Sequence, residues 1–172
     1  MTSKPALFPV RDASEADALA IAALRPATAD RLSAEFGQGH WSHPASEKGV
    51  LLGMKQARVL IMLDNGRLVG TLRLATRKPW AIDPAYFTMV DRALYLTDMA
   101  VAPSAQRAGV GRGLLEHAVA AAREWPADCI RLDAYDAPAG AGGFYARCGF
   151  REVGRVIYRK TPLIYYEKLI ND

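Results

Sequence analysis

The segment from Ala93 to Glu124, ALYLTDMAVAPSAQRAGVGRGLLEHAVAAARE, restricts the fold of this chain more than any other. Residues 94–101 are rich in aliphatic, aromatic and β-branched side chains, which predicts a strand that ends at Pro103. A glycine-rich loop follows. From Val110 onward, apolar side chains recur at helical spacing until Pro126, which predicts an amphipathic helix. A strand joined to a helix in this way indicates an α/β protein.

The loop itself predicts an anion-binding site. The first backbone N–H groups of a helix lack partners within it and carry the positive end of the helix dipole. Gly109 and Gly111 allow the backbone to approach a ligand closely, and Arg107 and Arg112 add positive charge. These features favour a di- or polyphosphate as the ligand.

Two common nucleotide-binding motifs do not fit this loop. A Walker A loop needs Lys followed by Ser or Thr, whereas Gly111 is followed by Arg112 and Gly113. The dinucleotide fingerprint G-x-G-x-x-G would begin at Gly109, but its third glycine falls on Leu114. A nucleotide-binding protein is therefore disfavoured.

The loop does fit the pattern Q/R-x-x-G-x-G/A through Gln106, Gly109 and Gly111. This resembles the coenzyme A pyrophosphate loop of the GNAT family, the GCN5-related N-acetyltransferases. Residues 145–150, YARCGF, are similar to the Y-x-x-x-G-F segment that follows the fifth strand in that family. Both motifs occur in family order, with a predicted strand over 129–135 between them.

The resemblance implies the α/β (α+β) acyl-CoA N-acyltransferase fold of the GNAT family. We expect a central mixed, mostly antiparallel sheet flanked by helices, in a single domain of residues 1–172. The chain is 51% hydrophobic and 23% charged, as in globular proteins. Further elements are predicted from periodicity, caps and turn signals: strands over 6–11, 58–63, 67–74, 151–158 and 162–168, and helices from Ser14 to before Pro26, over 29–35 and over 46–57.

The resemblance also implies acetyl-CoA as the cofactor. Its pantetheine arm would pair with the backbone of the fourth strand at Met99, Ala100 and Val101. Its pyrophosphate would be held by the seven loop residues Gln106, Arg107, Ala108, Gly109, Val110, Gly111 and Arg112. The family often has Asn seven residues before its tyrosine, where this chain has Pro138. That change removes one usual side-chain contact to the cofactor.

The catalytic residues are also suggested by the resemblance. Tyr145 matches the family's general acid, because a phenol can donate a proton to the departing thiolate; a packed core tyrosine is the alternative. Asp133 matches an acidic position in relatives of ribosomal-protein acetyltransferases. Asp98 lies at the expected irregularity of the fourth strand. Either carboxylate is a candidate base, acting directly or through water, unless each simply pairs with an arginine.

The acceptor is expected to be the amine of a small molecule or peptide. Trp41, Trp80 and Tyr86 are candidates for an aromatic wall of its pocket, although each has an equally good packing explanation. His40 and His43 suggest a metal at first sight. A zinc site needs three or four ligands, however, and no further ligand stands nearby in the sequence. We therefore expect no metal.

Charge and cysteine content limit the remaining possibilities. The net charge of +4 suits an anionic cofactor but is too small to indicate nucleic-acid binding. No apolar run predicts a membrane span or signal peptide, and two cysteines do not suggest a disulfide framework, so a cytoplasmic protein is expected. Many family members are dimers, which makes a homodimer an expectation without a located interface. The competing function is a non-catalytic acyl-CoA-binding sensor.

Overall fold

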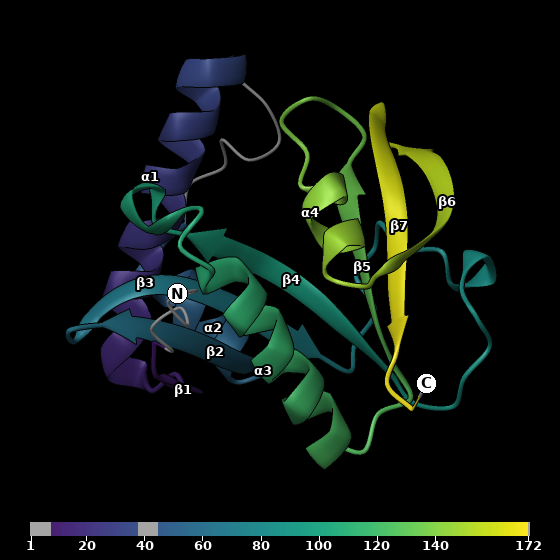
Figure 1. The fold of residues 1–172 in the computed structure, drawn as a ribbon, viewed down its shortest axis with the longest axis horizontal. Coiled ribbons are helices and arrows are strands. Elements are labelled where there is room, and N and C mark those ends of the chain that lie inside the picture. Colours follow the sequence, from purple (N-terminus) through teal and green to yellow (C-terminus); the bar gives the residue numbers. More distant parts are fainter. Residues whose placement is uncertain (1–7, 38–44, 172) are drawn as a thin grey trace, which may run out of the picture. The chain divides into compact units, whose positions relative to one another are not determined.

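The computed structural model describes residues 8–37 and 45–171. Within these ranges the helices are α1 (Ala18–Phe36), α2 (Glu47–Met54), α3 (Val110–Glu124) and α4 (Gly142–Arg147) (Figure 1). The strands are β1 (Val10–Asp12), β2 (Arg58–Asp64), β3 (Arg67–Ala75), β4 (Ala93–Val101), β5 (Cys129–Tyr135), β6 (Arg151–Tyr158) and β7 (Thr161–Leu169). Short 3-10 turns are η1 (Glu15–Asp17), η3 (Pro84–Tyr86) and η4 (Pro103–Ala105). None of the described helices is long and apolar enough to cross a membrane.

The strands form one sheet in the order β1-β2-β3-β4-β5-β7-β6. β4 and β5 are parallel, with Ala93 opposite Cys129. The pairs β1–β2, β5–β7 and β6–β7 are antiparallel. The predicted mixed, mostly antiparallel sheet is therefore confirmed.

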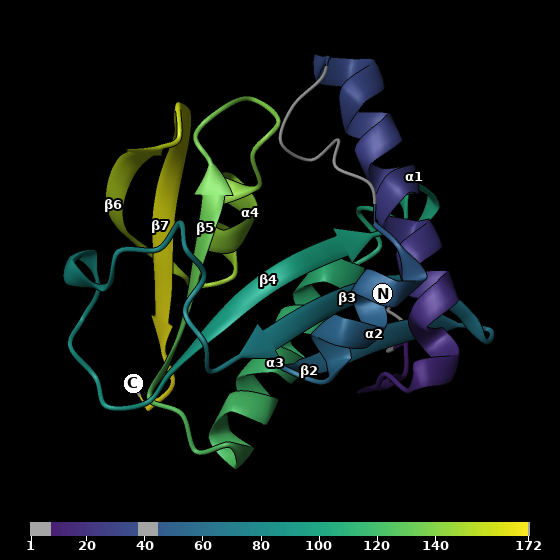
Figure 2. The same cartoon turned by 180° about the vertical axis from the view of Figure 1, so that it is seen from behind.

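The chain divides into two compact units, and each is described by itself. The first unit contains residues 1–73 and 98–118. In it, α1 and α2 cover one face of β2 and β3, and α3 covers the other (Figures 1 and 2). Successive side chains of β2 point to opposite faces of the sheet, which explains why helices pack on both faces. Ile61 packs with the apolar sides of α1 and α2, whereas the neighbouring Met62 approaches Gly113 of α3.

A close contact seats α3 on β3. A methyl group added at Gly70 of β3 would lie 2.8 Å from both Leu114 Cδ1 and Val110 Cγ1 of α3. Both of these α3 side chains are buried. The missing side chain at Gly70 therefore lets the first turns of α3 approach the strand.

The second unit contains residues 74–97 and 119–172. Here α4 lies on one face of β5 and β7, where Gly142 approaches the hydroxyl of Tyr166. Figure 2 shows the connection between β3 and β4 crossing the opposite face. On that face Ile82 and Phe87 of the connection pack with Tyr95 and Tyr165.

A row of charged side chains, buried at Arg131 and Glu167 and exposed at Arg151, fastens this connection to the sheet. Arg131, Glu167 and Arg151 are neighbours on β5, β7 and β6. The Glu167 carboxylate is 1% exposed and accepts hydrogen bonds from the Thr88 backbone N–H (3.0 Å), the Thr88 hydroxyl (2.6 Å) and Arg151. Arg131 donates to the Thr88 carbonyl at 2.8 Å. Thr88 is thus held from both sides.

The predicted break at Pro26 was wrong. α1 continues from Ala18 through Pro26 to Phe36, so the two helices expected there are one. Proline removes the N–H that would donate to the fourth residue before it and crowds the carbonyl of that residue, and tertiary packing outweighs both costs. Thr28, two residues later, donates its hydroxyl to the Leu24 carbonyl at 3.2 Å.

Most other predicted elements are confirmed. Ser46 caps α2 by accepting from the Gly49 N–H at 3.0 Å, although α2 ends at Met54, three residues earlier than expected. Asn65 and Gly66 have φ of 49° and 79° and form the predicted hairpin turn between β2 and β3. The strand predicted over 6–11 is observed as Val10–Asp12, and residues 1–7 lie outside the described ranges.

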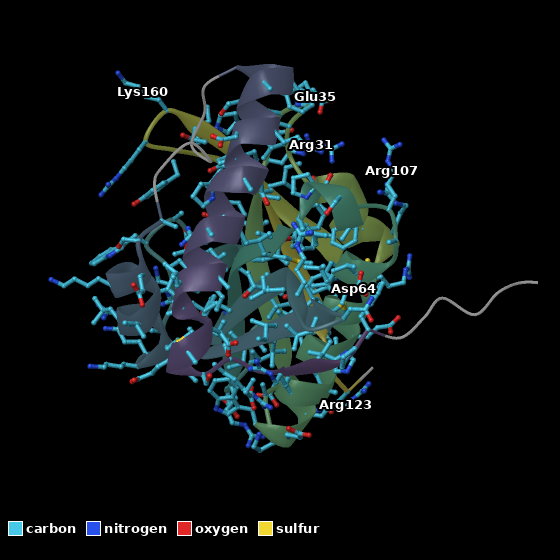
Figure 3. All side chains as sticks on the ribbon, turned by 90° about the vertical axis from the view of Figure 1, so that its left-hand side faces the viewer. Arg31, Glu35, Asp64, Arg107, Arg123 and Lys160 are labelled. Carbon is cyan, nitrogen blue, oxygen red and sulfur yellow. The ribbon has the colours of Figure 1, made fainter. Side chains whose placement is uncertain are left out.

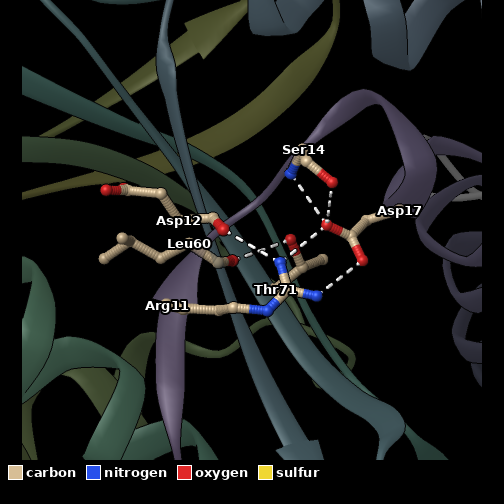
Figure 4. A network of polar contacts seen from close by, with 6 residues as sticks. All are labelled: Arg11, Asp12, Ser14, Asp17, Leu60 and Thr71. Carbon is tan, nitrogen blue, oxygen red and sulfur yellow. Dashed lines mark hydrogen bonds and ion pairs between the residues drawn. The ribbon is translucent and has the colours of Figure 1, made fainter.

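Figure 4 shows the polar network at the start of α1. Asp17 accepts from the Ser14 backbone N–H at 2.7 Å, in the manner of a capping box, and forms two hydrogen bonds with Arg11 at 2.7 and 2.9 Å. The hydrogen bonds from Arg11, and to a smaller extent those from Ser14, hold the pKa of the Asp17 carboxyl well below its usual value. Close by, the Thr71 hydroxyl donates to the Leu60 carbonyl at 3.0 Å.

We expect Asp17→Asn to lower stability by about 1 kcal/mol at neutral pH, the typical loss for a helix cap. Because the pKa of Asp17 is lower in the folded state, its contribution is complete above about pH 5 and disappears as the pH falls through the folded-state pKa. Urea unfolding at several pH values should therefore show the difference between wild type and variant shrinking in acid. A difference that does not depend on pH would contradict this explanation.

We expect Gly70→Ala to destabilise the protein by about 1–3 kcal/mol, the usual cost of overpacking, because its methyl group meets two buried side chains. Gly143→Ala is the matched control. Its methyl group would meet only the Arg147 guanidinium at 3.3 Å on the exposed side of α4. Thermal unfolding should show a lower Tm for Gly70→Ala alone.

Candidate functional site

The loop between β4 and α3 turns sharply before the helix begins. Arg107 and Gly109 have φ of +66° and +83°, so the chain turns twice through the left-handed region. α3 begins at Val110, and the Gly113 N–H donates to the Gly109 carbonyl at 2.9 Å. The N–H groups that precede Gly113 therefore lie at the start of a helix, where partners within the helix are lacking.

Side chains from distant elements brace this loop. Gln106 donates from Nε2 to the Val101 carbonyl at 3.3 Å and accepts from Arg31 Nη1 at 2.7 Å. Arg31 also approaches the Pro103 carbonyl at 3.3 Å. The Gln106 side chain thus positions the loop. The backbone N–H groups of the loop, and not this side chain, are the groups that could bind a ligand. Arg31 was missed from the sequence, because nothing local links α1 to a loop more than seventy residues away.

The loop is open to solvent and positively charged. Arg107, Ala108, Gly109 and Arg112 are exposed, and Figure 3 shows the Arg107 side chain extending away from the ribbon. Val110 is 1% exposed and anchors α3, so only its backbone faces a ligand. Gly109 has no atom within 4 Å of the position a Cβ would take. This arrangement fits a pyrophosphate, which needs converging N–H donors and nearby cations.

β4 is interrupted at Asp98, whose φ is +52° in an otherwise extended strand. The next three residues, Met99, Ala100 and Val101, are those for which pantetheine pairing was expected. The Val101 carbonyl already accepts from Gln106 and, at 3.4 Å, from the Thr28 hydroxyl. A left-handed residue breaks the regular ladder and redirects the peptide groups that follow it.

The Asp98 carboxylate lies between two arginines. Arg25 Nη2 is 3.1 Å from one carboxylate oxygen, and Arg73 Nη1 is 3.5 Å from the other. All three residues line a small pocket of about 70 Å³ within the first unit. The sequence had offered pairing with an arginine as the alternative to a base at Asp98, and the structure contains such pairs.

Tyr145 is buried on α4 in the second unit. Its ring packs against Phe144, Phe150 and Tyr166, with centroid separations of 5.4, 5.8 and 6.2 Å. Burial, reinforced by the negative charge of Asp133, raises the pKa of its hydroxyl above the ordinary value. The phenol is therefore fully protonated at neutral pH.

Asp133 lies on β5 in the same unit, opposite Tyr165 of β7. Burial raises the pKa of its carboxyl, and its charge in turn helps to raise the pKa of Tyr145, Tyr135 and Tyr165. The structure thus brings Asp133 and Tyr145 into one electrostatic environment. In such a pair the carboxylate can accept one proton and the protonated phenol can donate another.

The aromatic acceptor candidates remain untested. Trp80 is 82% exposed, and Tyr86 packs edge-on against Tyr165 with 5.5 Å between centroids. Trp41, like His40 and His43, lies outside the described residues. Among the described residues there is no group of three His, Cys, Asp or Glu side chains that could hold a metal ion.

Solved structures share this fold along nearly the whole chain. A GNAT acetyltransferase from Listeria monocytogenes is 23% identical, with a TM-score of 0.72 and 94% of each chain covered. The ribosomal-protein-alanine N-acetyltransferase from Brucella melitensis is 20% identical, with a TM-score of 0.71, over 94% of this chain and 99% of that one. A putative acetyltransferase from Salmonella typhimurium, solved with its cofactor acetyl-CoA, is 16% identical, with a TM-score of 0.70. The match covers 96% of this chain and 95% of that one.

No curated protein matches the sequence. The model of the acetyltransferase (GNAT) family, in contrast, matches residues 25–150, which begin within α1 and include the loop after β4, Asp133 and Tyr145. This match covers well over half of the chain, and the fold and the glycine-rich loop agree with it. The chain therefore belongs to the GNAT acetyltransferase family.

Proposed function

We propose that the protein transfers the acetyl group of acetyl-CoA to a primary amine of a small molecule or peptide, by direct attack of the amine. The observation that carries the proposal is the loop that turns through Arg107 and Gly109 into the N-terminus of α3. The N–H groups at the start of α3 and the two exposed arginines, Arg107 and Arg112, suit the pyrophosphate of coenzyme A.

Acetyl-CoA supplies an activated acetyl thioester. In this proposal residues 106–112 bind its phosphates, and the backbone of Met99, Ala100 and Val101 aligns its pantetheine arm. Pro138 supplies no side-chain hydrogen bond where relatives often have Asn, so the backbone carries more of the binding here.

Tyr145 is the proposed donor to the departing thiolate. Its hydroxyl is protonated at neutral pH and can donate once negative charge develops on sulfur, although the raised pKa makes it a weaker acid than an ordinary phenol. Asp133 is the proposed base for the acceptor ammonium. The raised pKa of this carboxyl brings it nearer to neutrality, where a base is most effective. Asp98 is less suited to accept a proton, because two guanidinium groups already face it.

We expect Tyr145→Phe to lower kcat by about 100-fold or more, the usual contribution of an acid–base group, while the Kd for acetyl-CoA stays unchanged. Phenylalanine preserves the ring packing against Phe144, Phe150 and Tyr166, so the variant should fold. Thiol release over an amine panel and calorimetric binding measure the two effects. Acetyl-CoA binding without turnover on any amine in the wild type would favour the sensor function instead.

The pH profile separates the two candidate bases. Asp133 must lose its proton to act, so activity should rise with pH through a pKa above the ordinary value near 3.9. In Asp133→Asn this rise below pH 7 should vanish together with most of kcat. Asp98→Asn should retain the rise. Loss of the rise in Asp98→Asn alone would assign the base to Asp98.

A further inference from the structure

The pocket beside Asp98 is too small for a whole acceptor. It has a volume of about 70 Å³ and is lined by residues of α1, α2, β2, β3 and β4, all in the first unit. A single water occupies about 10–15 Å³ measured in this way, so the pocket holds a few waters or one compact end group. The side chains around it indicate what that group is.

The charges of the pocket favour an anion. Arg25 and Arg73 face the single carboxylate of Asp98, at 3.1 and 3.5 Å, and this trio carries a net charge of +1. Each of the three side chains keeps about a third of its surface exposed, at 36%, 29% and 36% for Arg25, Arg73 and Asp98. The arginines therefore remain accessible to a ligand, and the Asp98 carboxylate keeps their two guanidinium groups close to each other.

Arg73 also has a donor without an acceptor. Its Nε is buried and has no hydrogen-bond partner among residues 8–37 and 45–171. An enclosed donor left in this state is costly, which makes such groups uncommon in native structures. The Arg73 guanidinium is therefore incompletely paired by the residues around it.

Gly53 of α2 fixes the position of this guanidinium. Arg73 Nη1 lies 3.1 Å from where a Cβ on Gly53 would stand, and Arg73 Cζ lies at 3.7 Å. A methyl group at this point would push the planar group away by a few tenths of an ångström. The orientation of Arg73 is thus built into the packing of α2 on β3.

We infer that this pocket binds a carboxylate of the acceptor, through Arg73 and Arg25, with Asp98 as the residue that positions both arginines. The inference rests on the proposed acetyltransferase function and narrows its substrate class to amines that carry a carboxylate. A planar carboxylate matches the planar guanidinium fork, and such charge-assisted pairs are the strong ones in proteins.

Turnover with matched acceptors tests the substrate class. A panel of free amino acids and dipeptides is compared with the corresponding amides, which retain the amine and lose the negative charge. We expect wild-type kcat/KM to favour the acids by about tenfold or more, as for the loss of one charge-assisted contact. Equal kcat/KM for acids and amides in the wild type would overturn the inference.

The variants assign the preference to residues. Arg73→Gln and Arg25→Gln should bring the acid-to-amide ratio towards one by lowering kcat/KM for the acids more than for the amides, while the Kd for acetyl-CoA stays unchanged. Gly53→Ala keeps every charge but displaces the Arg73 guanidinium, so it should lower the same ratio. The control is Arg67→Gln, an exposed arginine at the start of the same strand, which should leave the ratio intact. A ratio unchanged in both Arg73→Gln and Arg25→Gln would contradict the assignment.

A binding measurement makes the inference independent of turnover. N-acetylglycine and N-acetylglycinamide, which differ only at the carboxylate, are titrated into protein labelled with ¹⁵N-arginine. The Nε–H signal of Arg73 should shift with N-acetylglycine and not with the amide. If the Arg73 signal shifts with N-acetylglycine alone but no amine is acetylated, the proposed acetyltransferase function is contradicted and the carboxylate pocket is supported. Equal responses to both probes would remove the pocket even if amines are acetylated.

Discussion

The position of the glycine-rich loop depends on its two contacts with neighbouring residues of β3. Where the loop begins, the Ala102 N–H donates to the Val69 carbonyl at 2.8 Å. Where it ends, Val110 and Leu114 fill the space that a side chain at Gly70 would need. The brace from Arg31 through Gln106 adds a third support. A loop held at both ends can keep two left-handed residues, Arg107 and Gly109, in place.

Structural features encoded by a few adjacent residues were predictable from the sequence. Asn65-Gly66 forms the predicted turn because both positions need positive φ. Ser46 caps α2, and Asp17 accepts from the backbone N–H of the predicted N-cap Ser14, three residues before it. Arg159 and Lys160 are the exception. They form the turn between β6 and β7 with φ of 46° and 68° and no glycine, so the flanking strands and not the turn residues impose it.

Features set by partners distant in the sequence were not predictable. Periodicity ended α1 at Pro26, whereas packing carries it to Phe36. The glycine-rich loop was correctly located, but the ion pairs of Asp98 with Arg25 and Arg73 join three separate elements. Thr88 and Glu167 are likewise seventy-nine residues apart. A sequence pattern shows which groups can pair, and only the fold selects the partner.

The division into two units has a consequence for how the protein can be dissected. The chain passes from one unit to the other after residues 73, 97 and 118, and each crossing lies inside β3, β4 or α3. Neither unit is a contiguous stretch of sequence, and no cut at a crossing avoids severing a strand or a helix. Fragments made at these points would each lose part of their hydrogen-bonded backbone. Circular permutation at the exposed hairpin turns therefore offers a better route to relocating the termini than expressing either unit alone.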